Sequence, residues 1–282
     1  MIREAARFAA GWLPQPVRAQ LARRRFGYAG GGAAFDLTRT VQADGTTAIT
    51  IGDRLRFLLP ADAMPDFAFH FVENADSRDE MAAFMRLSHS APHDALLLDI
   101  GAHKGLFSLV HLAVDPRHRA VLIEPSRPLA AAATALLASN DASRRADVLV
   151  AGAGERSGTR RIVLDPLGFA QPAGEAGGEA VPFTTVDDLC GTRALAPAIL
   201  KIDVEGAEAE VLRGARATLR AHRPAICLEL HLDVLERRGD ALGALLDDLA
   251  AIGYRFESTR GRAVPLWRLR RSLMAIVRVV AR

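Results

Sequence analysis

Two carboxylates, Asp99 and Glu124, stand where consecutive buried-strand patterns end, with a glycine turn and a helical pattern between them. The turn has glycines at 101 and 105, a spacing that lets the chain turn sharply and the following helix lie close to the strand. Glu124 stands 19 residues beyond Gly105, where a carboxylate can accept both hydroxyls of a ribose. An acid directly before the turn repels a pyrophosphate and suits an amino group. The two acids together predict a nucleoside ligand with an amino-acid tail.

S-adenosylmethionine has that chemistry, and we expect it as the cofactor. The alternative is a nicotinamide dinucleotide used by an oxidoreductase. It is disfavoured because the loop lacks the G-x-G-x-x-G spacing and because Asp99 would face the diphosphate. Methyl transfer requires the acceptor atom to approach in line with the methyl carbon, and a group that takes the proton of the acceptor.

A second group of acids, Asp203, Glu205 and Glu208, follows the fourth strand pattern within six residues. Carboxylates at a strand end are costly unless they are used, paired or solvated. In a doubly wound sheet this strand end lies beside that of the first strand, so we expect Asp203 to face the nucleoside. Glu205 and Glu208 are equally well explained as acids in the first turn of a helix.

The candidates for the group that takes the proton of the acceptor are Asp203, Glu205, Glu229 and His231, at the ends of the two strands that flank the expected site. An imidazole titrates near neutral pH, which favours His231, although a histidine that caps a strand end explains it equally well. A metal held by Asp203, Glu229 and His231 is an alternative. The spacing of these residues does not establish a metal site, so we expect a general base and no metal.

The elements that would position these residues alternate along the chain from about residue 91. Short apolar runs alternate with helical patterns, which is typical of parallel strands covered by helices on both faces. We therefore predict an α/β domain with a mostly parallel, doubly wound sheet over residues 91–260. The predicted strands are 96–101, 120–124, 147–151, 199–204 and 225–230, the predicted helices are 104–114, 128–139, 207–221 and 235–252, and 165–182 is predicted to be a loop.

Residues 1–90 are predicted to form an accessory extension. Two strand patterns, 38–42 and 46–51, flank an Asp-Gly turn and predict a β-hairpin. A helix capped by Ser77, with Glu80 three residues further on, is predicted to continue to residue 88.

Residues 261–282 are predicted to form a basic amphipathic helix, because their apolar residues fall on one helical face and their arginines on the other. We favour a helix that docks on the body of the protein. Peripheral contact with the inner face of a membrane is the alternative, and it would suit a lipid-linked acceptor. The apolar face consists of Leu266, Leu269, Leu273, Ile276, Val277 and Val280.

Charge and hydropathy limit the classes of protein that the chain can belong to. Half of the 282 residues are hydrophobic and 24% are charged, a globular composition. The net charge is +3, but residues 1–27 carry +5 and residues 258–282 carry +7, so the body is acidic. No apolar run approaches the roughly 18 residues of a membrane-spanning helix, and the N-terminus lacks a secretory pattern. We expect a cytoplasmic protein and no nucleic-acid partner.

Several segments of the sequence resemble the FkbM family of S-adenosylmethionine-dependent methyltransferases. The segment 201–208, which reads Lys-Ile-Asp-Val-Glu-Gly-Ala-Glu, is the most specific, and the resemblance spans about residues 90–257. The resemblance implies a Rossmann-like class I methyltransferase fold. It also implies O-methylation, with a hydroxyl of a sugar, a glycan or glycolipid, or a secondary metabolite as acceptor. The other matching segments are 99–105, 123–125, Asn140, 184–189, 211–215, Pro224 and 229–231.

The resemblance also implies which residues hold the cofactor. The family often has an asparagine and an apolar residue where His103 and Lys104 stand, which leaves the roles of these two side chains open. The implied set is Asp99, Gly101, Ala102, His103 and Gly105 at the methionine end, Glu124 and Pro125 at the ribose, and Asn140 and Ala151 near the adenine.

Two further alternatives have less support. A fold of this type kept as a binding module at a membrane surface would not need Asp99, Glu124, Asp203 and Glu229, which are all present. An amino-group methyltransferase of nucleic acids would carry an aromatic-proline tetrad at the fourth strand, where this chain reads Asp-Val-Glu-Gly.

Overall fold

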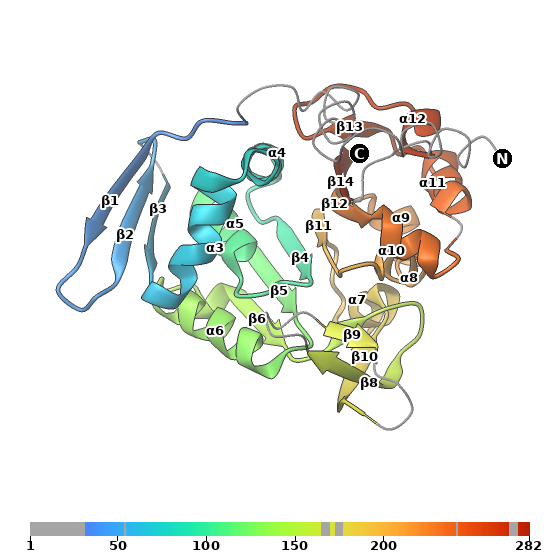
Figure 1. Ribbon diagram of the computed structural model, residues 1–282, viewed down its shortest axis with the longest axis horizontal. Helices are drawn as coiled ribbons and strands as arrows, with labels where there is room; N and C mark the ends of the chain where they lie inside the picture. The colour runs from blue at the N-terminus through green and yellow to red at the C-terminus, as the bar shows by residue number, and fades with distance from the viewer. Residues whose placement is uncertain (1–31, 54, 165–169, 173–176, 241, 271–275) are drawn as a thin grey trace, which may run out of the picture.

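A computed structural model describes residues 32–53, 55–164, 170–172, 177–240, 242–270 and 276–282 (Figure 1). Its centre is a seven-stranded sheet with the strand order β13-β14-β12-β11-β4-β5-β6. The five strands predicted within residues 91–260 are confirmed and run parallel, while β14 runs antiparallel to both of its neighbours. The strands are β4 (Leu96–Ile100), β5 (Arg119–Ile123), β6 (Ala146–Leu149), β11 (Ile199–Ile202), β12 (Ala225–His231), β13 (Phe256–Ser258) and β14 (Ile276–Ala281).

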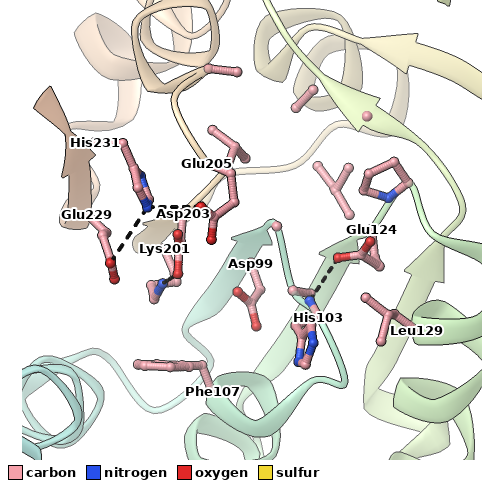
Figure 2. Close-up of a pocket in the computed structure, with 18 of the residues that line it drawn as sticks. Asp99, His103, Phe107, Glu124, Leu129, Lys201, Asp203, Glu205, Glu229 and His231 are labelled. Carbon is pink, nitrogen blue, oxygen red and sulfur yellow. Dashed lines mark hydrogen bonds and ion pairs between the residues drawn. The ribbon is translucent and has the colours of Figure 1, made fainter. Parts of the chain in front are cut away.

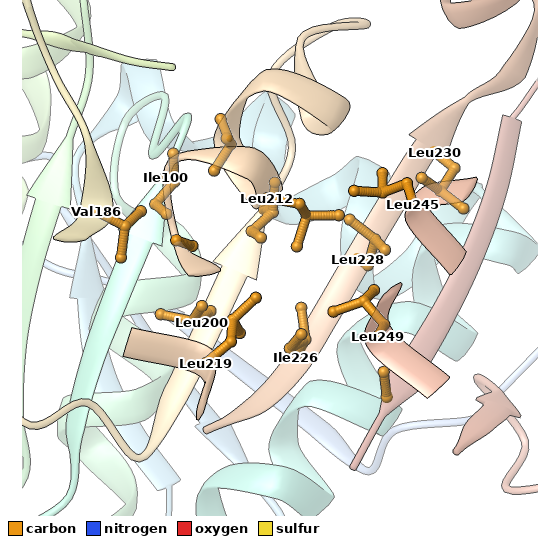
Figure 3. Packing of buried hydrophobic residues seen from close by; sticks show 14 of the residues in the cluster. Ile100, Val186, Leu200, Leu212, Leu219, Ile226, Leu228, Leu230, Leu245 and Leu249 are labelled. Carbon is orange, nitrogen blue, oxygen red and sulfur yellow. The ribbon is translucent and has the colours of Figure 1, made fainter. Parts of the chain in front are cut away.

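Helices cover both faces of this sheet, so the doubly wound arrangement is confirmed. Alternate strand residues face opposite sides: Leu98 and Leu200 join one apolar cluster, and Leu97 joins the other. Figure 3 shows the first cluster, between the sheet and the helices that follow β11 and β12. The helices are α5 (Leu106–Val114), α6 (Arg127–Ala138), α7 (Val186–Arg193), α8 (Glu208–Arg213), α9 (Arg216–His222), α10 (Leu232–Arg237) and α11 (Leu242–Ala251), with a 3₁₀ turn, η3, at Ser143–Arg145.

Two predicted helices are each divided in the structure. The helix predicted over 207–221 breaks into α8 and α9 at Gly214, where a Cβ atom would lie 2.1 Å from the carbonyl oxygen of Gly154. The helix predicted over 235–252 is α10 followed by α11. In both cases the apolar spacing predicted helical structure correctly. It did not show where one helix ends and the next begins, because both helices of each pair bury apolar residues at helical spacing.

The N-terminal part of the described chain forms a layer over the second apolar cluster (Figure 1). The predicted hairpin is confirmed and a third antiparallel strand extends it. The predicted cap at Ser77 is wrong. The helix begins earlier, and the Asn74 side chain caps it by accepting hydrogen bonds from the backbone nitrogens of Asp76 and Ser77. The elements are β1 (Leu37–Val41), β2 (Thr47–Ile51), β3 (Leu55–Leu59), η1 (Ala61–Ala63), α3 (Met64–Ala68), the π-helical turn η2 (Phe69–Glu73) and α4 (Ala75–Ser90).

The region predicted to be a loop over 165–182 contains two strands. Together with β7 (Gly152–Ala153) and β8 (Gly158–Leu164), they form a small sheet with the order β7-β10-β8-β9. Glycine and alanine obscured the strand signal here, because they pack few side chains on either face of the sheet. The two strands are β9 (Ala170–Pro172) and β10 (Glu179–Thr184), and residues 165–169 and 173–176 lie outside the described chain.

The predicted C-terminal amphipathic helix is wrong over most of its length. Among the described residues of 261–282, only α12 (Leu266–Arg270) is helical, and β14 is inserted into the central sheet beside β12. Val277 and Val279 are buried on one face of the sheet, and Arg278 projects from the other. The spacing of the apolar β-branched residues in this segment fits a strand as well as a helix. These valines therefore face the core, not a membrane. None of the helices that the structure describes is long and apolar enough to cross a bilayer.

Candidate active site

A cavity of about 1170 Å³ opens at the carboxyl ends of β4, β5, β11 and β12 (Figure 2). Small-molecule sites have volumes of roughly 300–1,000 Å³, so this cavity has space for a nucleoside and a second ligand. It brings together most of the residues that the sequence nominated. Those in its lining are Asp99, Gly101, Ala102, His103, Glu124, Pro125, Asp203, Glu205, Glu229 and His231.

The glycine loop after β4 is built as its spacing predicted. Gly101 has a φ of +78°, and a Cβ atom there would lie 1.8 Å from the carbonyl oxygen of Asp203. The loop therefore lies directly against the end of β11, and a side chain would push it away. Gly105 has a φ of +80° and packs against Leu122 and Ala133, outside the lining of the cavity. It lets α5 approach the sheet and does not itself face the cavity.

His103 and Lys104, the two departures from the family pattern, join the glycine loop to the N-terminal layer. His103 Nδ1 lies 3.5 Å and Lys104 Nζ 3.4 Å from the Oδ2 atom of Asp66, on α3. Lys104 Nζ also donates a hydrogen bond to the carbonyl oxygen of Asp62. These side chains therefore hold α3 over the loop, and Asp66 itself lines the cavity.

Asp99 is buried at the end of β4, where it accepts a hydrogen bond of 2.7 Å from the Ser108 hydroxyl. Burial raises the pKa of its carboxyl, against the opposing effect of the Lys201 charge. An amino group delivered by a ligand would stabilise the carboxylate. Asp99 therefore suits the amino-acid tail of a nucleoside ligand.

Glu124 follows β5, and each of its carboxylate oxygens already accepts one backbone N–H. His103 N donates to Oε2 at 2.9 Å and Ser126 N donates to Oε1 at 2.8 Å. A carboxylate oxygen has two lone pairs, so each oxygen can accept one more hydrogen bond, as the two hydroxyls of a ribose require. Burial raises the pKa of Glu124 to about 7, and the two backbone donors offset part of that effect.

Besides Gly105, two of the predicted cofactor residues, Asn140 and Ala151, lie outside the lining of this cavity. The Asn140 side chain pairs with the backbone of Leu58 on β3, accepting from its nitrogen at 2.7 Å and donating to its oxygen at 2.8 Å. It therefore anchors the N-terminal sheet to the end of α6. Ala151 is half-buried and packs against the first apolar cluster.

His231, at the end of β12, is surrounded by carboxylates (Figure 2). Its Nδ1 atom lies 2.8 Å from Glu208 Oε1, and its Nε2 atom lies 3.2 Å from Glu205 Oε2 and 3.8 Å from Glu229 Oε1. Burial alone would lower the pKa of the imidazole, but the hydrogen bonds with Glu205 and Glu208 raise it to about 11. In this arrangement the ring is an imidazolium at neutral pH. Its expected titration near neutrality, which made it attractive as a base, is therefore wrong.

A row of charged side chains, which sequence reasoning missed, lies on one face of the sheet, and Lys201, Glu229 and Arg278 of this row line the cavity. Lys201 Nζ lies 3.1 Å from Asp203 Oδ2, 3.5 Å from Glu80 Oε1 and 4.6 Å from the centre of the Phe107 ring. Arg278 lies opposite Glu229 in the register of β12 and β14. Lys201 interrupts an apolar strand, which is a signal in the sequence, but its partner Glu80 is far away along the chain.

Arg278 forms an ion pair that limits the chemical role of Glu229. It donates to both Glu229 oxygens, at 2.8 and 3.0 Å, and to Glu80 Oε2 at 2.9 Å. Both Glu229 oxygens are therefore held in a bidentate ion pair, a poor arrangement for a base or a metal ligand. Glu205 is the most exposed carboxylate around His231, with 35% of its side chain accessible. Its backbone has a φ of +52°, which points to a position held by the surrounding turn.

Comparison with known proteins identifies the family. Residues 99–256 match the methyltransferase FkbM domain. Among curated proteins, the chain is 28% identical over 222 residues to the AMB antimetabolite synthetase AmbE of Pseudomonas aeruginosa. The match covers 62% of this chain and only 10% of that protein, so the chain corresponds to a small part of its relative.

Solved structures of methyltransferases are also similar to this chain. A methyltransferase FkbM from Methylobacillus flagellatus has 18% identity and a TM-score of 0.44, covering 78% of this chain and 58% of that one. The O-methyltransferase TomG from Streptomyces achromogenes, in complex with S-adenosylmethionine, has 13% identity and a TM-score of 0.44, covering 78% and 85%. The antiparallel β14 between β12 and β13, in an otherwise parallel sheet, is the topology of a class I methyltransferase.

Proposed function

Because the chain belongs to the FkbM methyltransferase family, we propose that it is an O-methyltransferase that methylates a hydroxyl of a sugar, a glycan or glycolipid, or a secondary metabolite. Its cofactor is S-adenosylmethionine. One observation carries the proposal. A single cavity has Asp99 and Glu124 at one end and a group of carboxylates after β11 and β12 at the other.

The residues at the first end fit the cofactor. Asp99 offers a buried carboxylate to an amino group, and Glu124 offers one unused lone pair on each oxygen to the ribose hydroxyls. Ala102 and Pro125 also line the cavity and add uncharged, apolar surface to it. When bound, S-adenosylmethionine supplies a methyl group on a sulfonium sulfur.

The residues at the second end suit a hydroxyl acceptor. A hydroxyl must be held in line with the methyl carbon and must lose its proton as the new bond forms. Of the four nominated groups, His231 is held as a cation and Glu229 is held by Arg278. We therefore propose that Glu205 accepts the proton of the hydroxyl and that Asp203 orients the acceptor. The ion pair with Lys201 fixes the Asp203 carboxylate in place.

The test is transfer of a ¹³C-labelled methyl group from S-adenosylmethionine to a panel of glycans, glycolipids and hydroxylated secondary metabolites. We expect the label on oxygen, where its chemical shift in an NMR spectrum differs from that of an N-methyl or C-methyl group. Glu205→Gln should lower turnover about a hundredfold or more, as expected from the loss of a general base, with cofactor affinity unchanged. Asp248→Asn, in an exposed pair with Arg216, is the matched control. A label on nitrogen or carbon, or full turnover by the variant, would contradict the proposal.

A further inference from the structure

We propose that Asp203, Glu205 and His231 bind a divalent cation, Mn²⁺ or Mg²⁺, at the carboxyl ends of β11 and β12. One oxygen from each of the two carboxylates and one ring nitrogen lie within 4.8 Å of one another. Binding of the cation stands on this geometry alone, and its role in the reaction rests on the proposed function.

The backbone holds the three groups at one point. Asp203 and Glu205 come from the turn after β11, and His231 is the last residue of β12, the neighbouring parallel strand. Both Glu205 and Gly206 have positive φ, and a Cβ atom on Gly206 would lie 2.2 Å from the Val234 side chain. The turn is therefore pressed against α10, with little freedom to move Glu205 away from His231.

Glu208 orients the imidazole as metal sites require. The Glu208 side chain is fully buried, and its Oε1 atom lies 2.8 Å from His231 Nδ1 and accepts the backbone N–H of Gly206. A carboxylate on one ring nitrogen leaves the other to face the cation, and a metal-bound histidine usually donates its second ring N–H to a carboxylate, a backbone carbonyl or water. Here the other nitrogen, Nε2, faces Glu205 (Figure 2). Cation binding replaces the proton on Nε2, because a ligating nitrogen must be deprotonated.

Asp203 provides an independent observation. Its Oδ1 atom is buried and has no hydrogen-bond partner, while Oδ2 is paired with Lys201. Buried polar atoms without a partner are rare in folded proteins, and a bound water or ion is the usual explanation. A cation bound between the side chains of Asp203 and Glu205 would supply that partner.

The ligands indicate the kind of cation. Two carboxylates with one imidazole suit hard to intermediate cations, and the absence of thiolate ligands in the set disfavours soft ones. Three protein ligands leave positions for water or for an acceptor hydroxyl. Glu229, nominated from the sequence in place of Glu205, does not belong to this set of ligand atoms, and Arg278 already pairs with both of its oxygens.

In the reaction, the cation would bind the acceptor oxygen and make its proton more acidic. The O–C bond then forms while the S–C bond breaks, and the sulfur keeps the electron pair. The hydroxyl proton passes to the Glu205 oxygen that does not bind the cation.

The test is direct binding of Mn²⁺ to the purified full chain, followed by electron paramagnetic resonance. We expect one Mn²⁺ per chain, with a ¹⁴N coupling from an imidazole in the pulsed spectrum of the unmodified protein. Glu205→Gln should weaken binding about tenfold or more, and Asp248→Asn should leave it unchanged. No stoichiometric binding, bound Mn²⁺ without a nitrogen coupling, or equal affinity in Glu205→Gln would overturn the proposal.

The two proposals fail differently. If S-adenosylhomocysteine binds and methyl transfer continues in excess chelator, the role of the cation in the reaction is refuted while the methyltransferase assignment stands. If Mn²⁺ binds with the nitrogen coupling but no hydroxyl is methylated, the site stands and the proposed function fails.

Discussion

Glu124 predicts how cofactor affinity depends on pH. Its pKa of about 7 lies above the ordinary value of 4.5, so the carboxyl is protonated below pH 7 and ionised above it. Ribose hydroxyls donate hydrogen bonds, so they favour the ionised form. Affinity should therefore rise with pH and level off above pH 7.

The size of the effect follows from the fraction ionised. With a pKa of about 7, about one carboxyl in ten is ionised at pH 6 and about nine in ten at pH 8. Affinity should differ about tenfold between these pH values, or about 1.4 kcal/mol. Glu124→Gln removes the titrating group, so the variant should bind about tenfold more weakly at pH 8 and show no such rise with pH.

Calorimetric titration with S-adenosylhomocysteine between pH 5.5 and 8.5 measures both quantities. Glu179→Gln is a matched control, because Glu179 pairs with Arg127 on the exposed surface of the small sheet and does not line the cavity. A wild-type affinity that stays constant from pH 6 to 8, or a slope that persists in Glu124→Gln, would refute the role given to this carboxyl.

Three further variants test the construction of the site. Gly101→Ala places a Cβ atom 1.8 Å from the Asp203 carbonyl oxygen at a residue with positive φ. It should lower the free energy of unfolding by about 2 kcal/mol or more and weaken S-adenosylhomocysteine binding. Wild-type values in urea unfolding and calorimetry would show that the loop tolerates a side chain. Asn140→Leu loses both hydrogen bonds to Leu58, so it should lower the free energy of unfolding by about 1–3 kcal/mol with cofactor affinity unchanged. Weaker cofactor binding with unchanged stability would instead support the predicted contact between Asn140 and the adenine. Glu80→Gln removes the charge between two buried cations and should cost about 3–5 kcal/mol of unfolding free energy in urea, whereas a loss under 1 kcal/mol would contradict the buried network.

The central strands and the first loop could be predicted from the sequence, because their signals are local. Buried parallel strands are short apolar runs, and the glycines at 101 and 105 mark a turn that only a small residue fits. The carboxylates at the strand ends then follow from topology, since parallel strands end at the same edge of the sheet.

The remainder depends on contacts between distant parts of the chain. The segment around Val277 fits the period of a helix and that of a strand, and only pairing with β12 decides between them. Asn140 matches a family motif, but Leu58, its partner, lies 82 residues away in a layer that the motif does not include. Glu80 and Arg278 meet across 198 residues, a separation at which no spacing rule applies.

The most direct test of the account is calorimetric titration of the purified chain with S-adenosylhomocysteine, with NAD as the control. We predict a single site of micromolar affinity for S-adenosylhomocysteine and no binding of NAD. No binding of S-adenosylhomocysteine, or binding that Asp99→Ala leaves unchanged, would contradict the claim that this cavity is the cofactor site of a working methyltransferase.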